Sequence, residues 1–78
     1  MIHGLIYSRH GCHLCEVAEK TAKELQSEYS YQLSVEFIDG HPELEKEYGE
    51  KVPVIIINGQ PHDYWRIDRA RFIAAVSN

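Results

Sequence analysis

Tyr7-Ser8-Arg9-His10-Gly11-Cys12-His13-Leu14-Cys15 links a short apolar run to a segment with helical periodicity. The run before it, 3–7, has the composition of a strand. After it, apolar or small residues recur at helical spacing: Leu14, Val17, Ala18, Thr21, Ala22 and Leu25. Both cysteines therefore fall where a strand gives way to a helix, one helical turn apart on the same face. In a chain with βαβ character, C-x-x-C at this place indicates thiol redox chemistry.

Cys12 is predicted to be the exposed nucleophile, and Cys15 the more buried resolving thiol. A thiol attacks a disulfide only as the thiolate, and its ordinary pKa is about 8.5. The unpaired N–H groups and the positive dipole end at a helix start favour the thiolate at Cys12. Arg9, His10 and His13 can add positive charge nearby. A pKa lowered to about 6 would correspond to a thiolate stabilised by about 3.4 kcal/mol.

The size and composition predict one domain over residues 1–78. The chain is 44% hydrophobic and 26% charged, which is typical of a globular protein. Its 8 basic and 12 acidic residues give a net charge of −4, which weighs against a nucleic-acid partner. No segment approaches the ~20 apolar residues of a membrane span, and the N-terminus lacks a signal-peptide pattern. We therefore expect a cytoplasmic monomer with no membrane partner.

The remaining periodicity and turn signals predict the order βαβαββα. Expected strands cover 1–8, 33–39, 52–57 and 60–65, and expected helices cover 12–29, 42–48 and a last segment capped by Asp68. The strand–helix–strand unit predicts that the first two strands are parallel. Asn58-Gly59 predicts a tight hairpin between the last two strands. On the first helix, Glu16–Lys20 and Glu19–Lys23 are expected to form solvated i,i+4 pairs.

With C-x-x-C after its first strand and Val52-Pro53 opening the third, the chain resembles the thioredoxin fold. The resemblance implies an α/β fold class, with a four-stranded mixed sheet flanked by helices. Within that fold, Tyr7-Ser8-Arg9-x-x-Cys12-x-x-Cys15, Lys51-Val52-Pro53 and Ile57-Asn58-Gly59-Gln60 resemble a glutaredoxin, most closely the small bacterial glutaredoxin-like domains. The resemblance implies a thiol–disulfide oxidoreductase. It also implies that Pro53 is cis beside the disulfide and that the Val52 backbone binds the incoming substrate.

The chain departs from typical glutaredoxins at two places. His13-Leu14 stands between the cysteines in place of Pro-Tyr or Pro-Phe, and Tyr64-Trp65 follows the hairpin in place of Gly-Gly. A protonated His13 would stabilise the thiolate. Arg66 and Asp68 are candidate contacts for the termini of glutathione in another geometry, and Asp68 is also a candidate helix cap.

These features predict a disulfide-containing protein or a glutathione mixed disulfide as the substrate. A reductase or a small thiol would supply electrons, with glutathione as a candidate reductant and no bound cofactor. The reduction potential is expected between about −270 and −120 mV, the range of related C-x-x-C proteins.

Two alternatives remain open on the sequence alone. In the first, the cysteines bind a metal ion or an iron–sulfur cluster, because His10, Cys12, His13 and Cys15 form a dense group of candidate ligands. In the second, the domain is a non-catalytic interaction module. Two cysteines together with Val52-Pro53 weigh against the second alternative, because a scaffold requires neither.

Overall fold

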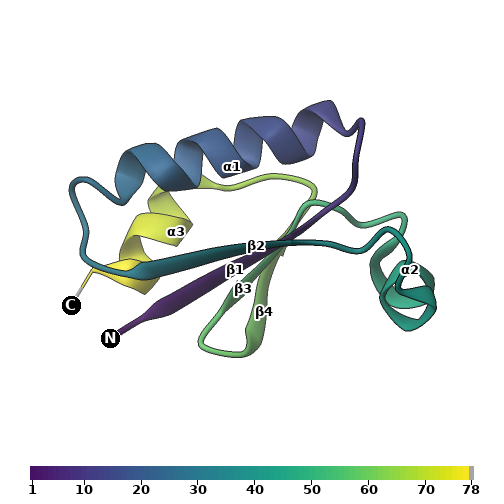
Figure 1. The fold of residues 1–78 in the computed structure, drawn as a ribbon. Coiled ribbons are helices and arrows are strands. Elements are labelled where there is room, and N and C mark those ends of the chain that lie inside the picture. The colour runs from purple at the N-terminus through teal and green to yellow at the C-terminus, as the bar shows by residue number, and fades with distance from the viewer. Residues whose placement is uncertain (78) are drawn as a thin grey trace.

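A computed structural model describes residues 1–77 of the chain. The elements follow in the order β1 (His3–Ser8), α1 (His13–Leu25), β2 (Gln32–Phe37), α2 (Pro42–Tyr48), β3 (Val54–Ile57), β4 (Gln60–Tyr64) and α3 (Arg69–Val76), as Figure 1 shows. This is the predicted βαβαββα order. No helix among the described residues is both long and apolar enough to cross a membrane.

The four strands form one mixed sheet in the order β2-β1-β3-β4. β1 and β2 are parallel, with Gly4 opposite Leu33 and Ser8 opposite Phe37. β3 is antiparallel to both β1 and β4. The predicted parallel pair and hairpin are confirmed, and the architecture is that of the thioredoxin fold.

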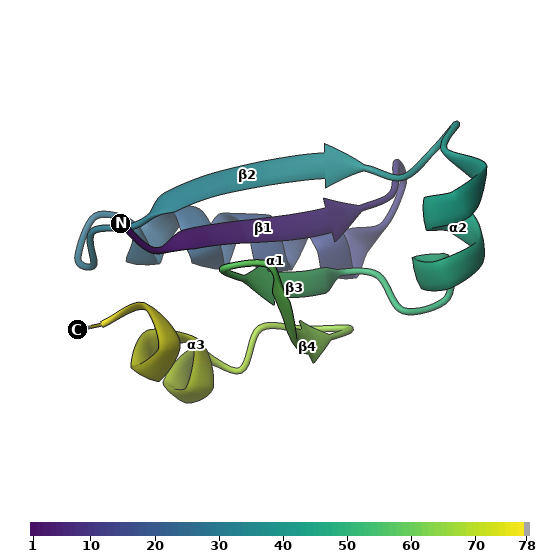
Figure 2. The ribbon, with the colours of Figure 1, turned by 90° about the horizontal axis from the view of Figure 1, so that it is seen from below.

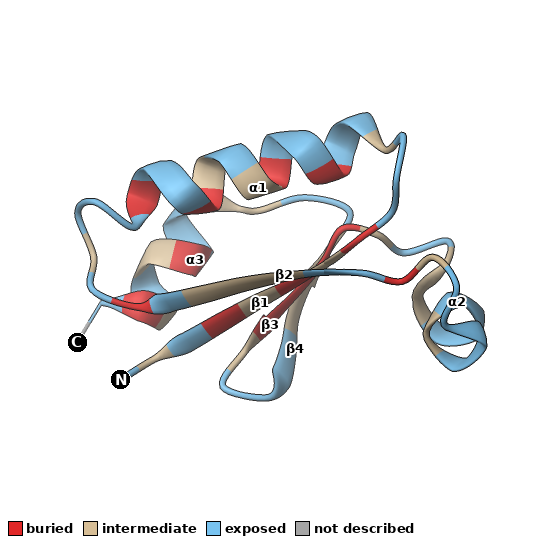
Figure 3. Cartoon of the chain, viewed as in Figure 1, coloured by how far each residue is buried: buried red, intermediate tan, exposed pale blue. Residues whose placement is uncertain are grey.

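The core lies between the sheet and the helices α1 and α3. The residues of α1 that are fully buried face the sheet, while the opposite side of this helix is exposed (Figure 3). The main cluster joins all these elements and consists of Ile6, Ala18, Ala22, Leu25, Tyr31, Ile55, Phe72 and Val76. The Phe72 ring meets the Tyr31 ring edge-on at a centroid distance of 5.5 Å. This packing therefore holds α1, whose start carries both cysteines, against the sheet.

Several predicted boundaries are wrong by a few residues. α1 ends at Leu25 rather than at residue 29, because the chain then tightens into a turn in which Ser27 and Glu28 donate to carbonyls three residues back. β2 ends at Phe37 because its partner β1 ends at Ser8. β3 begins only at Val54, after Pro53, which has no N–H for the ladder. β4 ends at Tyr64, because Trp65 has a positive φ of 68°.

One end of the sheet gathers the loops that carry the candidate site. Tyr7, Val54 and Tyr64 lie in one row across β1, β3 and β4, and Ser8 lies opposite Phe37 of β2. The loops after β1, β2 and β4 and the loop before β3 therefore all leave the sheet at this end. α2 lies beyond the same end (Figure 2). Residues from four separate segments are thus brought to one edge of the molecule.

Candidate active site

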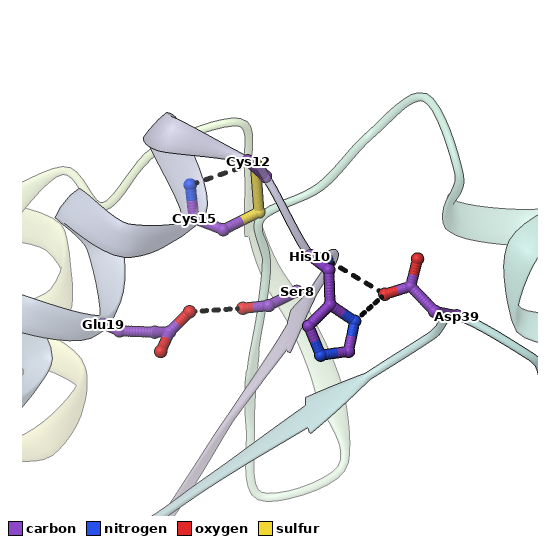
Figure 4. A network of polar contacts seen from close by, with 6 residues as sticks. All are labelled: Ser8, His10, Cys12, Cys15, Glu19 and Asp39. Carbon is purple, nitrogen blue, oxygen red and sulfur yellow. Dashed lines mark hydrogen bonds and ion pairs between the residues drawn. A yellow bond between two sulfur atoms is a disulfide. The ribbon is translucent and has the colours of Figure 1, made fainter.

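The two cysteines form a disulfide at the start of α1, with their Cα atoms 5.2 Å apart. Cys12 is the N-cap of the helix, and its Sγ accepts a hydrogen bond of 3.1 Å from the backbone N–H of Cys15 (Figure 4). The Cys15 residue is completely buried, whereas Cys12 is half-buried. An incoming sulfur can therefore reach Cys12 but not Cys15.

The start of α1 provides the electrostatic environment that a Cys12 thiolate needs. The backbone N–H groups of the first turn have no carbonyl four residues earlier to which they can donate. One of them, that of Cys15, already points at the Cys12 sulfur. A charged acceptor makes such a bond roughly twice as strong as a neutral one. This N–H group is placed to favour a thiolate over a thiol, and stabilisation of a Cys12 thiolate stays a prediction.

His13 is placed on the outer side of the first turn. Its side chain is 85% exposed, and its Nδ1 lies 3.9 Å from the carboxylate of Glu16. His13 directly follows Cys12 in the chain, but its ring is paired with the Glu16 carboxylate. Stabilisation of a thiolate by His13 stays a prediction.

His10 is directed toward Asp39 rather than toward the sulfurs. Its backbone N–H donates to Asp39 Oδ2 at 2.9 Å, and its ring Nδ1 lies 2.9 Å from the same oxygen (Figure 4). The ring also stacks on Phe37 at a centroid distance of 4.3 Å. The hydrogen bond from the His10 backbone is the main reason why the pKa of Asp39 lies below its ordinary value. Addition of positive charge near Cys12 by His10 stays a prediction, and the structure shows its ring paired with Asp39.

Arg9 reaches away from the backbone of the cysteine loop to the end of α2. Its guanidinium donates to the carbonyl of Gly49 at 3.0 Å. Gly49 is the C-cap of α2, where a positive charge also interacts favourably with the helix dipole. This contact fixes α2 to the cysteine loop, and a direct role of Arg9 toward the thiolate stays a prediction.

Ser8 and Glu19 form a polar contact beneath the cysteine loop that the sequence did not reveal. The Ser8 hydroxyl is fully buried at the end of β1 and donates to Glu19 Oε2 at 3.0 Å (Figure 4). The expected Glu19–Lys23 pair is not among the ion pairs formed within residues 1–77. A serine at a strand end shortly before a helix was the only available signal, and it does not identify the partner.

The loop before β3 leaves backbone groups available beside the site. The Val52–Pro53 peptide bond is cis, and Pro53 is buried. The N–H of Trp65 donates to the carbonyls of Lys51 and Pro53, at 3.2 and 2.8 Å. Neither backbone group of Val52 forms a hydrogen bond within the part of the chain that the structure describes. Val52, which is expected to bind substrate, therefore lies between two residues whose carbonyls are bonded to Trp65. Its own N–H and C=O remain without a hydrogen bond among the described residues.

Arg66 and Asp68 follow this loop but have different surroundings. Asp68 is the N-cap of α3, and its Oδ1 accepts a hydrogen bond of 3.2 Å from the Arg71 backbone. The predicted cap is thus confirmed. Arg66 is exposed, and its guanidinium forms no hydrogen bond or ion pair in the chain up to Ser77. Binding of glutathione by either residue stays a prediction.

The metal alternative has no assembled ligand set here. Among residues 1–77, no three side chains of the His, Cys, Asp and Glu types come together in a way that could hold a metal ion. The two sulfurs are bonded to each other, and the ring of His10 is paired with Asp39.

Comparisons with solved structures agree with this architecture. The solution structure of a protein from Nitrosomonas europaea has a TM-score of 0.85 and 29% identity, and the match covers 97% of this chain and 92% of that one. The X-ray structure of a protein from X. campestris has a TM-score of 0.76 and 30% identity, with 91% of each chain covered.

Sequence comparisons identify the family. Uncharacterised proteins of Mycobacterium tuberculosis and Mycobacterium bovis are 35% identical to this chain over 78 residues, covering 92% of it and 79% of the relatives. Residues 5–77 match the family described as glutaredoxin-like domain (DUF836). The Cys12–Cys15 pair in such a domain supports a thiol redox role. The chain belongs to the family of glutaredoxin-like domains.

Proposed function

We propose that this protein is a thiol–disulfide oxidoreductase that reduces disulfides through Cys12 and Cys15. The observation that carries the proposal is the difference between the two sulfurs. Cys12 is accessible and caps a helix, whereas Cys15 is buried one turn further on and is already bonded to it. In this division, Cys12 would attack the substrate disulfide, and Cys15 would release the substrate thiol from Cys12.

The reaction balances as two successive exchanges. The Cys12 thiolate attacks one sulfur of the substrate disulfide, the substrate S–S bond breaks, and the first substrate thiol leaves with a proton. Cys15 then loses its proton and attacks Cys12 Sγ, which releases the second substrate thiol and forms the Cys12–Cys15 disulfide. Two electrons pass from the dithiol to the substrate. A small thiol such as glutathione, or a reductase, returns them.

Val52 and Pro53 complete the proposed substrate site. A substrate cysteine in an extended chain could pair with the unused N–H and C=O of Val52, as a strand pairs with a sheet edge. This pairing would hold the substrate sulfur in line with the attacking thiolate. The proposed substrates are disulfide-containing proteins and glutathione mixed disulfides, encountered in the cytoplasm.

Two single variants test the assignment of the sulfurs. Cys15→Ser should accumulate a mixed disulfide between Cys12 and the substrate, visible as an added mass that a reducing agent removes. Cys12→Ser should form no such adduct and should lose reduction of a protein disulfide. Equal adduct formation by both variants, or full reduction by Cys12→Ser, would show that Cys12 is not the nucleophile.

A further inference from the structure

We propose that Trp65 is a specificity-determining residue whose indole binds an apolar side chain next to the reacting cysteine of a polypeptide substrate. The inference deepens the proposed function and rests on it. It assigns a substrate class: an extended protein segment in preference to glutathione.

The position of Trp65 is fixed relative to Val52. Its backbone N–H bonds to the carbonyls on both sides of that residue, and its indole Nε1–H donates to the carbonyl of Glu50 at 2.9 Å. These contacts hold both the backbone and the ring plane of Trp65 against the segment Glu50–Pro53. A substrate paired with the Val52 backbone would therefore bind to the same segment that holds this ring.

The backbone of Trp65 is unfavourable for a bulky residue. Its φ of 68° lies in the left-handed region, where a residue with a Cβ costs about 1–2 kcal/mol. Glycine would adopt this conformation without that cost. Residues kept in such conformations are concentrated at functional sites. A tryptophan at a glycine-favouring position therefore indicates a use for the side chain.

The surface that Trp65 presents is apolar. The residue is 55% exposed although its only polar side-chain atom is already bonded to Glu50. Leu14 and Val17 are also exposed, at 54% and 48%, on the first turns of α1, which begins at the same end of the sheet. Three large apolar side chains are thus exposed on elements that meet at this end of the sheet, and such a surface favours a partner with apolar side chains.

Glutathione has no group that can use such a surface. Its cysteine is flanked by a γ-linked glutamate and by a glycine, and neither carries an apolar side chain. A protein segment can place a leucine or an aromatic residue beside its cysteine. Contact of that side chain with the indole would favour the protein segment over the tripeptide.

The test uses the Cys15→Ser variant and activated disulfides that release coloured thionitrobenzoate when Cys12 attacks. Three probes are compared: a cysteine peptide followed by leucine, the same peptide with serine in that place, and glutathione, each as its thionitrobenzoate disulfide. We expect the leucine peptide to react with a second-order rate constant about tenfold higher than the other two, which corresponds to about 1.4 kcal/mol. Adding Trp65→Ala should reduce this preference to less than about twofold, whereas Trp65→Phe, which keeps an aromatic face, should retain most of it.

A second readout needs no change at Trp65. The chain contains a single tryptophan, so its fluorescence reports on this ring alone. In the purified adducts of the Cys15→Ser variant, the leucine peptide should shift the emission to the blue, and glutathione should not. This measurement also decides the question if Trp65→Ala fails to fold.

The outcomes separate the inference from the proposed function. Adducts that form on Cys12 with equal rates and equal emission would overturn the role of Trp65 and leave the oxidoreductase intact. A leucine preference that survives in folded Trp65→Ala would likewise overturn it. Failure of every probe to form an adduct on Cys12 would overturn the proposed function, and the inference with it.

Discussion

Removal of the contact between Ser8 and Glu19 should destabilise the protein well beyond a surface substitution. The Ser8 side chain is fully buried, and its hydroxyl donates to a carboxylate oxygen at 3.0 Å. A hydrogen bond to a charged group contributes about 1.5–3 kcal/mol. In Ser8→Ala the carboxylate is only partly buried and can be hydrated, so we expect a loss near the lower end, about 1.5 kcal/mol. For a domain of this size that loss lowers Tm by about 6–12 °C.

The reverse substitution leaves a different defect. Glu19→Ala would leave a buried hydroxyl without an acceptor, which costs about 1–3 kcal/mol. The double variant loses the contact only once, so its destabilisation should be smaller than the sum of the single effects. We expect a coupling energy of about 1–1.5 kcal/mol, measured by urea unfolding of the oxidised protein at neutral pH.

Lys23→Ala is the matched control on the same helix. It would be as costly as Glu19→Ala if Glu19 acted through the i,i+4 pair that the sequence suggests. The structure instead predicts a change within about 0.5 kcal/mol, as for an exposed residue. A coupling energy between Ser8 and Glu19 below about 0.3 kcal/mol, or a large effect of Lys23→Ala, would refute the reasoning.

Three further predictions concern the cysteine loop and the core. Gly11 has a φ of 74°, and no atom outside Gly11 and its two chain neighbours lies within 4 Å of the position that a Cβ would take. Gly11→Ala should therefore cost about 1–2 kcal/mol in urea unfolding through its backbone alone, and a larger cost would contradict this explanation. Asp39 has a lowered pKa in the folded protein, so its contribution to stability is present above its ordinary pKa of 3.8 and is lost as the pH falls through the lower folded value. The stability difference between wild type and Asp39→Asn should therefore shrink on acidification below that pH, and a difference that grows would contradict the sign. Phe72→Ala should cost about 3–5 kcal/mol, because the ring is 1% exposed and packs on Tyr31, and a loss below about 1 kcal/mol by urea unfolding would contradict its place in the core.

The elements were predictable because local signals and tertiary packing agree. Part of the apolar periodicity, Ala18, Ala22 and Leu25, marks the buried face of α1, whereas Leu14 and Val17 of the same series are exposed. Pro42 indicated the start of α2, and Asn58-Gly59 indicated the hairpin. The place of the cysteines followed from the same reasoning, because they lie between a strand signal and a helix signal. Local chemistry was therefore sufficient for the order of the elements and for the position of Cys12 at the helix start.

Contacts between distant side chains could not be predicted in this way. The pairing of His10 with Asp39 depends on the register of β1 and β2, in which residues 29 apart lie opposite each other. Alternation of apolar residues determines which face is buried, but it leaves shifts by two residues unresolved. The same limit applies to Ser8 and Glu19 and to Trp65 against the loop before β3. Each of these contacts joins segments whose relative position only the folded chain defines.

These distant contacts explain how the cysteine loop can keep its shape when the disulfide opens. On one side, Ser8 is bonded to α1 through Glu19, and on the other, His10 is bonded to Asp39, which follows the end of β2. Cys12 caps α1 between these supports. The disulfide itself closes so short a loop that it constrains the unfolded chain little. Since the supports do not include the S–S bond, we expect reduction to remove one covalent link and to leave the Cys12 sulfur beside the same backbone N–H group. In the proposed reaction, the dithiol would then attack a substrate without first having to rebuild the helix start.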